Sequence, residues 1–236
     1  MKRAHIVYCH PEAKSFVGAM AATARVALER TGWQVTSSDL YAKHFNPVAS
    51  VQDFGSRGNP EHLVYSLEQR HAREHGTLAQ DIVAELEPVL ESELLVLAFP
   101  VFWFSVPAML KGWFDRVLLS GTFYGGRRVY DRGGMTGRRA IVLTSLGGRE
   151  HMFGPGAIHG DLAMGMLRHV TQGTLGYVGY EVYEPFVAFH VPYVTDEARR
   201  GLLISLDEQV TALDQRRLLE MPRLDGFDEQ FSPLTR

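Results

Sequence analysis

Short apolar runs alternate with amphipathic segments along most of this chain. The runs have the length of β-strands, and they lie at residues 4–8, 33–37, 94–99, 139–145, 180–183 and 187–191. Residues 4–8 and 94–99 are almost entirely apolar, which is typical of strands buried on both faces. Apolar residues spaced three or four apart predict helices at residues 15–30, 78–90, 105–119, 161–174 and 196–213. This alternation predicts an α/β fold, a doubly wound parallel sheet with helices on both faces.

Local signals set several of the expected boundaries. Ser15 and Ser105 are of a residue type that caps helix N-termini, so each should open the helix that follows it. We expect the helix at 78–90 to end near Pro88. Residues 45–76 are irregular and long for a structureless loop, which predicts a functional segment or a short helix there. The polar, proline-containing end predicts a domain at residues 1–213 and a C-terminal arm or tail at 214–236.

Composition narrows the class of protein. The formal net charge of −3 does not favour a nucleic-acid partner, because such proteins carry a basic face. Cys9 is the sole cysteine, so it forms no internal disulfide, and its apolar surroundings indicate a core thiol. No apolar run approaches the roughly 20 residues that span a bilayer, and no metal-binding motif is present. We therefore expect a cytoplasmic protein with no metal site and no membrane span.

The loop after the first strand is a candidate phosphate site. His10, Ser15 and Phe16 lie where a strand ends and a helix begins, and a helix N-terminus offers free N–H groups and a positive dipole end. The loop matches neither the P-loop nor the Gly-x-Gly-x-x-Gly pattern, which argues against a standard ATPase or Rossmann site. The alternative is an ordinary capped helix.

Two further loops follow strands at the same edge of the predicted sheet. Pro100, Val101, Phe102, Trp103 and Phe104 form an aromatic loop that suits a flat ring, and the alternative is a core aromatic cluster. The second loop consists of Ser145, Leu146, Gly147 and Gly148. Its glycines let the backbone approach a ligand closely, and the alternative is a plain turn.

A fourth candidate is His159, which lies among glycines between Gly156 and Asp161. An imidazole can give or take a proton near neutral pH, or stabilise a transient negative charge. The chain has nine other histidines, so a loop histidine without a function is the alternative.

These four loops, in this order, resemble those of the NAD(P)H:quinone oxidoreductase (DT-diaphorase) family, whose members are flavoproteins of flavodoxin-like fold. The resemblance covers roughly residues 3 to 210, and it is carried mainly by residues 99–104, 106–114 and 156–161. It implies that NAD(P)H reduces a bound flavin, FAD with FMN as the alternative. A quinone in the same pocket is then reduced to a hydroquinone by hydride transfer, in ping-pong order. It also implies a homodimer with active sites at the subunit interface.

The resemblance assigns roles position by position. His159 is the expected catalytic residue. The expected flavin-binding residues are His10, Ser15, Phe16, Pro100, Val101, Phe102, Trp103, Phe104, Ser145, Leu146, Gly147, Gly148 and Arg199, with Arg199 at the adenine end. The expected substrate pocket contains Trp103, Tyr124, Gly126, Phe153 and His159, with Tyr124 reaching in from a partner subunit.

Three positions depart from the family pattern. Phe153 and Gly126 stand where mammalian members have tyrosines, and Phe102 stands where they have a glutamine. A phenyl ring lines a pocket but donates no proton, so His159 would stabilise charge alone. Two alternatives remain open: a regulatory flavoprotein subunit of a potassium-efflux transporter, and an azo or nitro reductase on the same scaffold.

Overall fold

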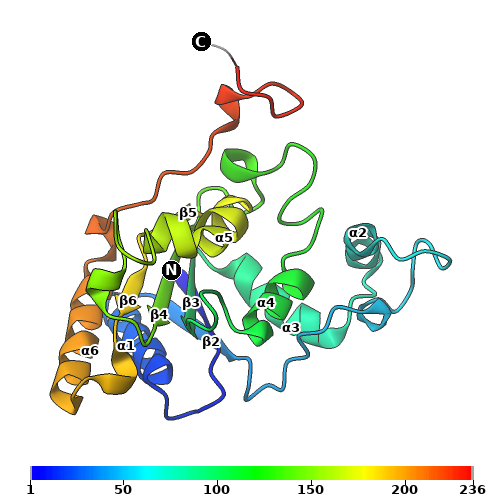
Figure 1. Ribbon diagram of the computed structural model, residues 1–236. Helices are drawn as coiled ribbons and strands as arrows, with labels where there is room; N and C mark the ends of the chain where they lie inside the picture. The colour runs from blue at the N-terminus through cyan, green and yellow to red at the C-terminus, as the bar shows by residue number, and fades with distance from the viewer. Residues whose placement is uncertain (1, 235–236) are drawn as a thin grey trace.

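A parallel sheet runs through the centre of the computed structural model, which describes residues 2–234 (Figure 1). Its strands are β1 (Arg3–Tyr8), β2 (Gln34–Asp39), β3 (Leu94–Pro100), β4 (Arg139–Ser145), β5 (Glu181–Val182) and β6 (Phe186–Ala188). They are ordered β2-β1-β3-β4-β5, and β6 pairs with β4 further along the same edge. The predicted doubly wound parallel sheet is confirmed. The order reverses between β1 and β3, where such sheets bind ligands.

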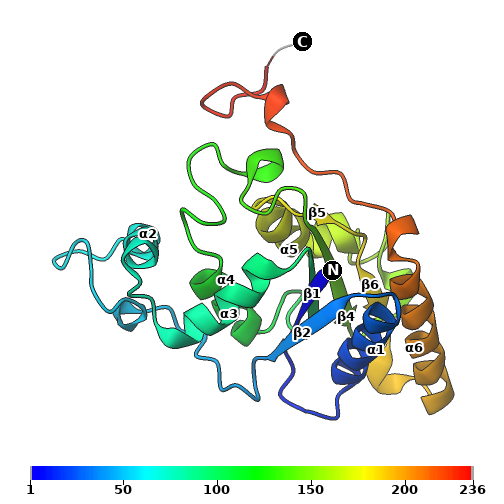
Figure 2. The same cartoon turned by 180° about the vertical axis from the view of Figure 1, so that it is seen from behind.

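Helices cover both faces of this sheet (Figures 1 and 2). On one face, α1 (Phe16–Arg30) and α6 (Asp196–Thr211) pack over one hydrophobic core. On the other face lie α3 (Gln80–Glu91), α4 (Ala108–Val117) and α5 (Arg168–Val170). All seven residues of β3 are buried between the two cores, as the apolar run predicted. The remaining helix, α2 (Tyr65–His75), covers neither face of the sheet and lies to the side of α3 and α4. It falls within the segment expected to be irregular.

Three local expectations need correction. Helix α3 continues through Pro88 to Glu91, because Leu86 and Val89 are buried there and packing offsets the lost backbone hydrogen bond. Ser105 does not cap α4, whose N-cap is Pro107 and has no side-chain cap. The predicted helix at 161–174 is α5 between two π-helical turns, Leu162–Met166 and Thr171–Gly176.

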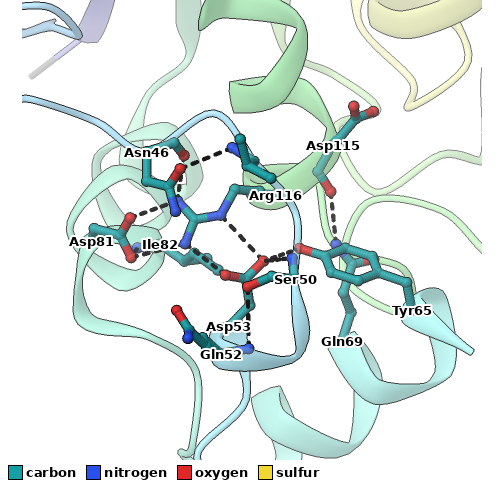
Figure 3. A network of polar contacts seen from close by, with 11 residues as sticks. Asn46, Ser50, Gln52, Asp53, Tyr65, Gln69, Asp81, Ile82, Asp115 and Arg116 are labelled. Carbon is teal, nitrogen blue, oxygen red and sulfur yellow. Dashed lines mark hydrogen bonds and ion pairs between the residues drawn. The ribbon is translucent and has the colours of Figure 1, made fainter. Parts of the chain in front are cut away.

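Residues 45–76, the strap, are tied to α4 by one buried arginine. The Arg116 guanidinium donates to the Asp53 carboxylate, to the Asp81 carboxylate and to the Asn46 carbonyl (Figure 3). Tyr65 at the start of α2 donates its hydroxyl to Asp53 at 2.5 Å. The strap therefore reaches across α4 through side-chain contacts that a short-range pattern does not encode.

The predicted arm, described as far as residue 234, leaves the end of α6, passes the outer edge of β5 and then projects away from the sheet (Figure 1). Leu218 forms an antiparallel bridge with Tyr183, and the Leu219 N–H donates to the Val182 carbonyl at 2.8 Å. Further along, the Leu224 N–H donates to Asp131 at 3.0 Å. The division at residue 213 stays a prediction, and residues 235–236 lie outside the described part of the chain.

Within residues 2–234, no helix is long and apolar enough to cross a membrane. The same residues hold no group of three or more His, Cys, Asp or Glu placed to bind a metal ion.

Candidate active site

A cavity of about 390 Å³ opens at the carboxyl edge of the sheet, where the loops after β1, β3 and β4 meet. It lies at the point where the strand order reverses. Nine of the predicted cofactor-binding residues line it: His10, Ser15, Phe16, Pro100, Val101, Phe102, Ser145, Leu146 and Gly147. Three loops that are far apart in the sequence therefore share one site.

One end of the cavity is the N-terminus of α1. Ser15 caps this helix, because its hydroxyl accepts from the Gly18 N–H at 3.1 Å. The Tyr8 hydroxyl lies 3.0 Å from the Ser15 hydroxyl, and burial raises the pKa of Tyr8. The N–H groups of Phe16 and Val17 belong to the first helical turn and have no carbonyl partner within it. This end of the cavity is therefore suited to an anion such as a phosphate.

The aromatic loop ends in a tight two-residue turn. The N–H of Phe102 donates to the Ser105 carbonyl at 2.9 Å, and the N–H of Ser105 donates back at 3.0 Å. Trp103 and Phe104 have φ of 50° and 59°, the left-handed region that bulky residues seldom occupy. The turn projects Trp103 into solvent, where it is 97% exposed. Because Val101 donates to the Ser145 carbonyl at 2.8 Å, free loop N–H groups are confined to the turn.

The loop after β4 is framed by the segment that follows β6. The Leu146 N–H donates to the Ala188 carbonyl at 3.0 Å, and the Val191 N–H donates to the Leu146 carbonyl at 3.2 Å. These bonds leave the N–H groups of Gly147 and Gly148 available to a ligand. Val191 and Pro192 also line the cavity, as do Glu12 and Val17. The sequence alone singles out none of these four as ligand contacts, although Val191 and Pro192 follow a strand that ends at the same edge.

His159 is joined to the aromatic loop through a cluster of rings. Its imidazole lies 5.1 Å from the Phe104 ring, in an edge-on arrangement, and 5.2 Å from the Phe153 ring. The His159 N–H donates to the Met152 carbonyl at 3.0 Å, which holds the backbone of this loop. Neighbouring Ile158 is 82% exposed. The histidine therefore lies in an open apolar corner beside the cavity, with phenyl groups as its ring partners.

Arg199 supports the cavity wall from behind. Its Nε and Nη2 donate to the Val191 carbonyl at 3.3 and 3.2 Å, and its Nη1 pairs with Asp196 at 2.6 Å. The expected contact with an adenine stays a prediction. Gly148 lies beside the Phe153 ring, because a Cβ there would come within 3.0 Å of it.

The structure does not bring Tyr124 and Gly126 to this cavity within one chain. Tyr124 packs against Tyr177, with ring centroids 5.6 Å apart. Gly126 lines a separate apolar cavity of about 400 Å³ beneath the C-terminal arm. The expected place of both residues in the substrate pocket, with Tyr124 reaching in from a partner subunit, stays a prediction.

Comparison with known proteins agrees with this geometry. A family model described as flavodoxin-like fold matches residues 2–210. The chain is 38% identical to NAD(P)H dehydrogenase [quinone] 1 of Cavia porcellus, over 86% of this chain and 74% of that protein. It is 36% identical to the human ribosyldihydronicotinamide dehydrogenase [quinone], over 90% of this chain and 92% of that protein.

A solved structure from Klebsiella pneumoniae, described as a candidate quinone reductase, superposes with a TM-score of 0.87. The two sequences are 30% identical, and the match covers 98% of this chain and 90% of the Klebsiella chain. The expected family and fold are thereby confirmed: the chain belongs to the flavodoxin-like NAD(P)H dehydrogenase (quinone) family.

Proposed function

We propose that this protein is a flavin-dependent NAD(P)H:quinone oxidoreductase. The observation that carries the proposal is the cavity at the sheet edge, which joins a helix N-terminus, an aromatic loop and a glycine loop. An anion site at one end and an apolar wall at the other match the two ends of a flavin nucleotide. Membership of the quinone dehydrogenase family supports the same activity.

The residues present fit a flavin. The first turn of α1 would hold a phosphate, the wall at Pro100–Phe102 would lie along the ring, and the Gly147 and Gly148 N–H groups would meet its polar edge. A bound flavin supplies the ability to accept a hydride from NAD(P)H and to pass two electrons to a quinone. Arg199, which the family resemblance places at the adenine end, braces the cavity-lining residue Val191, which supports FAD over FMN.

We assign the charge-stabilising role to His159. Its two ring partners, Phe104 and Phe153, carry no acidic proton, so the imidazole is the group in this cluster that can stabilise negative charge. Trp103 would form a wall for flat substrates. As the family resemblance implies, nicotinamide and quinone would use this corner in turn, with ping-pong kinetics and a hydroquinone product.

We also propose a homodimer. Trp103 and Ile158 are large apolar side chains left exposed beside the cavity, which is typical of a surface covered by a partner. The predicted pocket residues Tyr124 and Gly126 lie away from the cavity of their own chain, which supports their use in a second copy.

One purification tests the proposal. The protein should show flavin absorption bands, and heat release followed by chromatography should identify FAD. Initial rates of NADH and NADPH oxidation with a panel of quinones should give parallel double-reciprocal lines, and sedimentation should give a dimer mass. Failure to bind flavin, even after reconstitution, would sink the proposal. Faster turnover of azo dyes or nitroaromatics than of quinones would favour the azo or nitro reductase alternative. Weak quinone turnover together with a co-purifying membrane transporter would favour the regulatory-subunit alternative.

A further inference from the structure

The Ser105 hydroxyl makes a hydrogen bond with a residue 64 positions later. Its Oγ lies 2.8 Å from Nε2 of His169. A serine near the start of a helix ordinarily caps it, which stabilises the helix by about 1 kcal/mol. Here α4 begins after Pro107 with no side-chain cap. The Ser105 hydroxyl therefore makes a hydrogen bond with His169 and does not cap the helix.

The second nitrogen of His169 determines the direction of this hydrogen bond. Nδ1 lies 3.1 Å from the Met166 carbonyl oxygen, which can only accept. Nδ1 therefore carries the proton in the neutral ring, and Nε2 accepts from the Ser105 hydroxyl. Both ring nitrogens are engaged, and the ring is held between a backbone carbonyl and Ser105.

His169 itself lies in an irregular part of the fold. It belongs to α5, a three-residue helix between two π-helical turns. Such turns are rare and frequently occur at functional sites. Thr174 adds a hydrogen bond from its hydroxyl to the His169 carbonyl at 2.9 Å. The irregular segment thus presents to the aromatic loop an exposed imidazole that is hydrogen-bonded at both ring nitrogens.

Two backbone hydrogen bonds close the turn Phe102–Ser105, and the contact of Ser105 with His169 adds a tertiary one. Trp103 and Phe104 both have left-handed backbone conformations, which cost on the order of 1–3 kcal/mol each and persist where surrounding contacts hold them. Trp103 is almost fully exposed, so packing of its own ring does not hold the turn. Phe104, in contrast, lies against His159.

We propose that Ser105 and His169 are positioning residues for the active site. Their hydrogen bond ties the turn Phe102–Ser105, which two backbone hydrogen bonds already close, to the π-helical segment, and the turn so oriented sets Phe104 against the imidazole of His159. The effect on turnover rests on the proposed quinone reductase function. The pair, its tautomer and its link to His159 are properties of the protein alone.

Turnover tests the proposal through a double-mutant cycle. Ser105→Ala and His169→Ala should each lower kcat/KM for a quinone by about fivefold, the effect of one lost hydrogen bond. The double variant should lose no more than either single variant, because one interaction is removed in all three. His169→Gln keeps an acceptor near the Nε2 position and should stay within about twofold of the parent. His62→Ala, an exposed histidine before α2, is the matched control. Additive losses in the double variant would overturn the proposal.

Nitrogen-15 NMR of the histidine rings supplies a readout independent of turnover. The parent protein should show His169 in the Nδ1–H form, and Ser105→Ala should shift both the His169 Nε2 signal and the His159 ring signals. An Nε2–H form in the parent, or unchanged His159 signals in Ser105→Ala, would refute the positioning role. If the parent reduces no quinone, the proposed function fails while these spectra still decide the role of the pair.

Discussion

The Arg116 guanidinium donates two hydrogen bonds, of 2.8 and 3.2 Å, to the Asp53 carboxylate, although 63 positions separate the residues. Both side chains are 2% exposed. Burial alone would raise the pKa of Asp53, but hydrogen bonds from Arg116, Tyr65 and the Ser50 N–H outweigh it, and the pKa is lowered. The ion pair anchors the strap to α4, the helix that follows the aromatic loop (Figure 3).

Breaking this pair from one side should be costly. Arg116→Met leaves the Asp53 carboxylate buried without its cation, and such changes cost about 3–5 kcal/mol of unfolding free energy. The double variant Arg116→Met/Asp53→Asn should recover part of the loss, because no buried unpaired charge remains; Asp81, the other carboxylate partner of Arg116, is 40% exposed. Urea unfolding measures all three proteins. Arg73→Met removes an exposed pair with Glu87 and should change stability by about 0.5 kcal/mol or less. Equal losses in the single and double variants would contradict this account.

The stability of the protein should fall in mild acid because of His5. Burial lowers the pKa of His5 to about 4; the charge of Glu85 raises it by a smaller amount, and that of Lys43 lowers it further. Its Nδ1 lies 2.8 Å from the Thr36 hydroxyl, while its buried Nε2 has no hydrogen-bond partner among residues 2–234. The unfolded chain binds a proton near pH 6.5 and the folded chain only near pH 4, so stability is lost as pH falls between these values.

The expected loss between pH 7 and pH 4 from this one residue is about 3 kcal/mol. His5→Asn should flatten the pH dependence of the urea midpoint over that window, whereas His62→Asn, at an exposed position, should leave it unchanged. Identical pH profiles for His5→Asn and the parent would show that His5 does not titrate as described. Protonation of Asp53 acts at lower pH, since its folded pKa lies below the ordinary carboxyl range.

Two glycines in this chain should respond in opposite ways to alanine. A Cβ at Gly133 would collide with the Val178 carbonyl, because the loop before β4 packs backbone to backbone on the turn before β5. Gly133→Ala should therefore destabilise the protein by about 1–3 kcal/mol. Gly201 lies within α6 with no atom near its added Cβ, so Gly201→Ala should stabilise by up to about 1 kcal/mol. Thermal unfolding compares the two, and a neutral Gly133→Ala would mean that the loop can move away.

His159→Gln should slow reduction of the bound flavin by NADPH by roughly 10- to 100-fold, the scale of losing one well-placed electrostatic donor. Anaerobic stopped-flow measurement at the flavin absorption band gives this rate directly. Flavin content should stay at the parent level, because His159 lies outside the cavity lining. His151→Gln, an exposed histidine in the same loop, serves as the control. An unchanged rate in His159→Gln would remove the histidine from the mechanism.

The features that could be predicted from sequence depend on neighbours along the chain. The strand at 94–99 was predicted because a run of apolar residues is buried on both faces, and the cap at Ser15 because capping involves residues three apart. The three loops of the cavity were placed together because parallel strands end at one edge of a sheet. The family resemblance then added the roles of individual residues, which periodicity does not contain.

The features that only the tertiary structure decided join residues that the sequence holds far apart. The Ser105 hydroxyl was expected to cap a helix, and His169, brought beside it by the π-helical segment, offered a different partner. Pro88 stayed inside its helix because buried neighbours hold that turn. The left-handed turn at Trp103 and Phe104 goes against local backbone preference. In each case a long-range contact outweighs a local preference of only a few kcal/mol, and the sequence by itself does not show which contacts form.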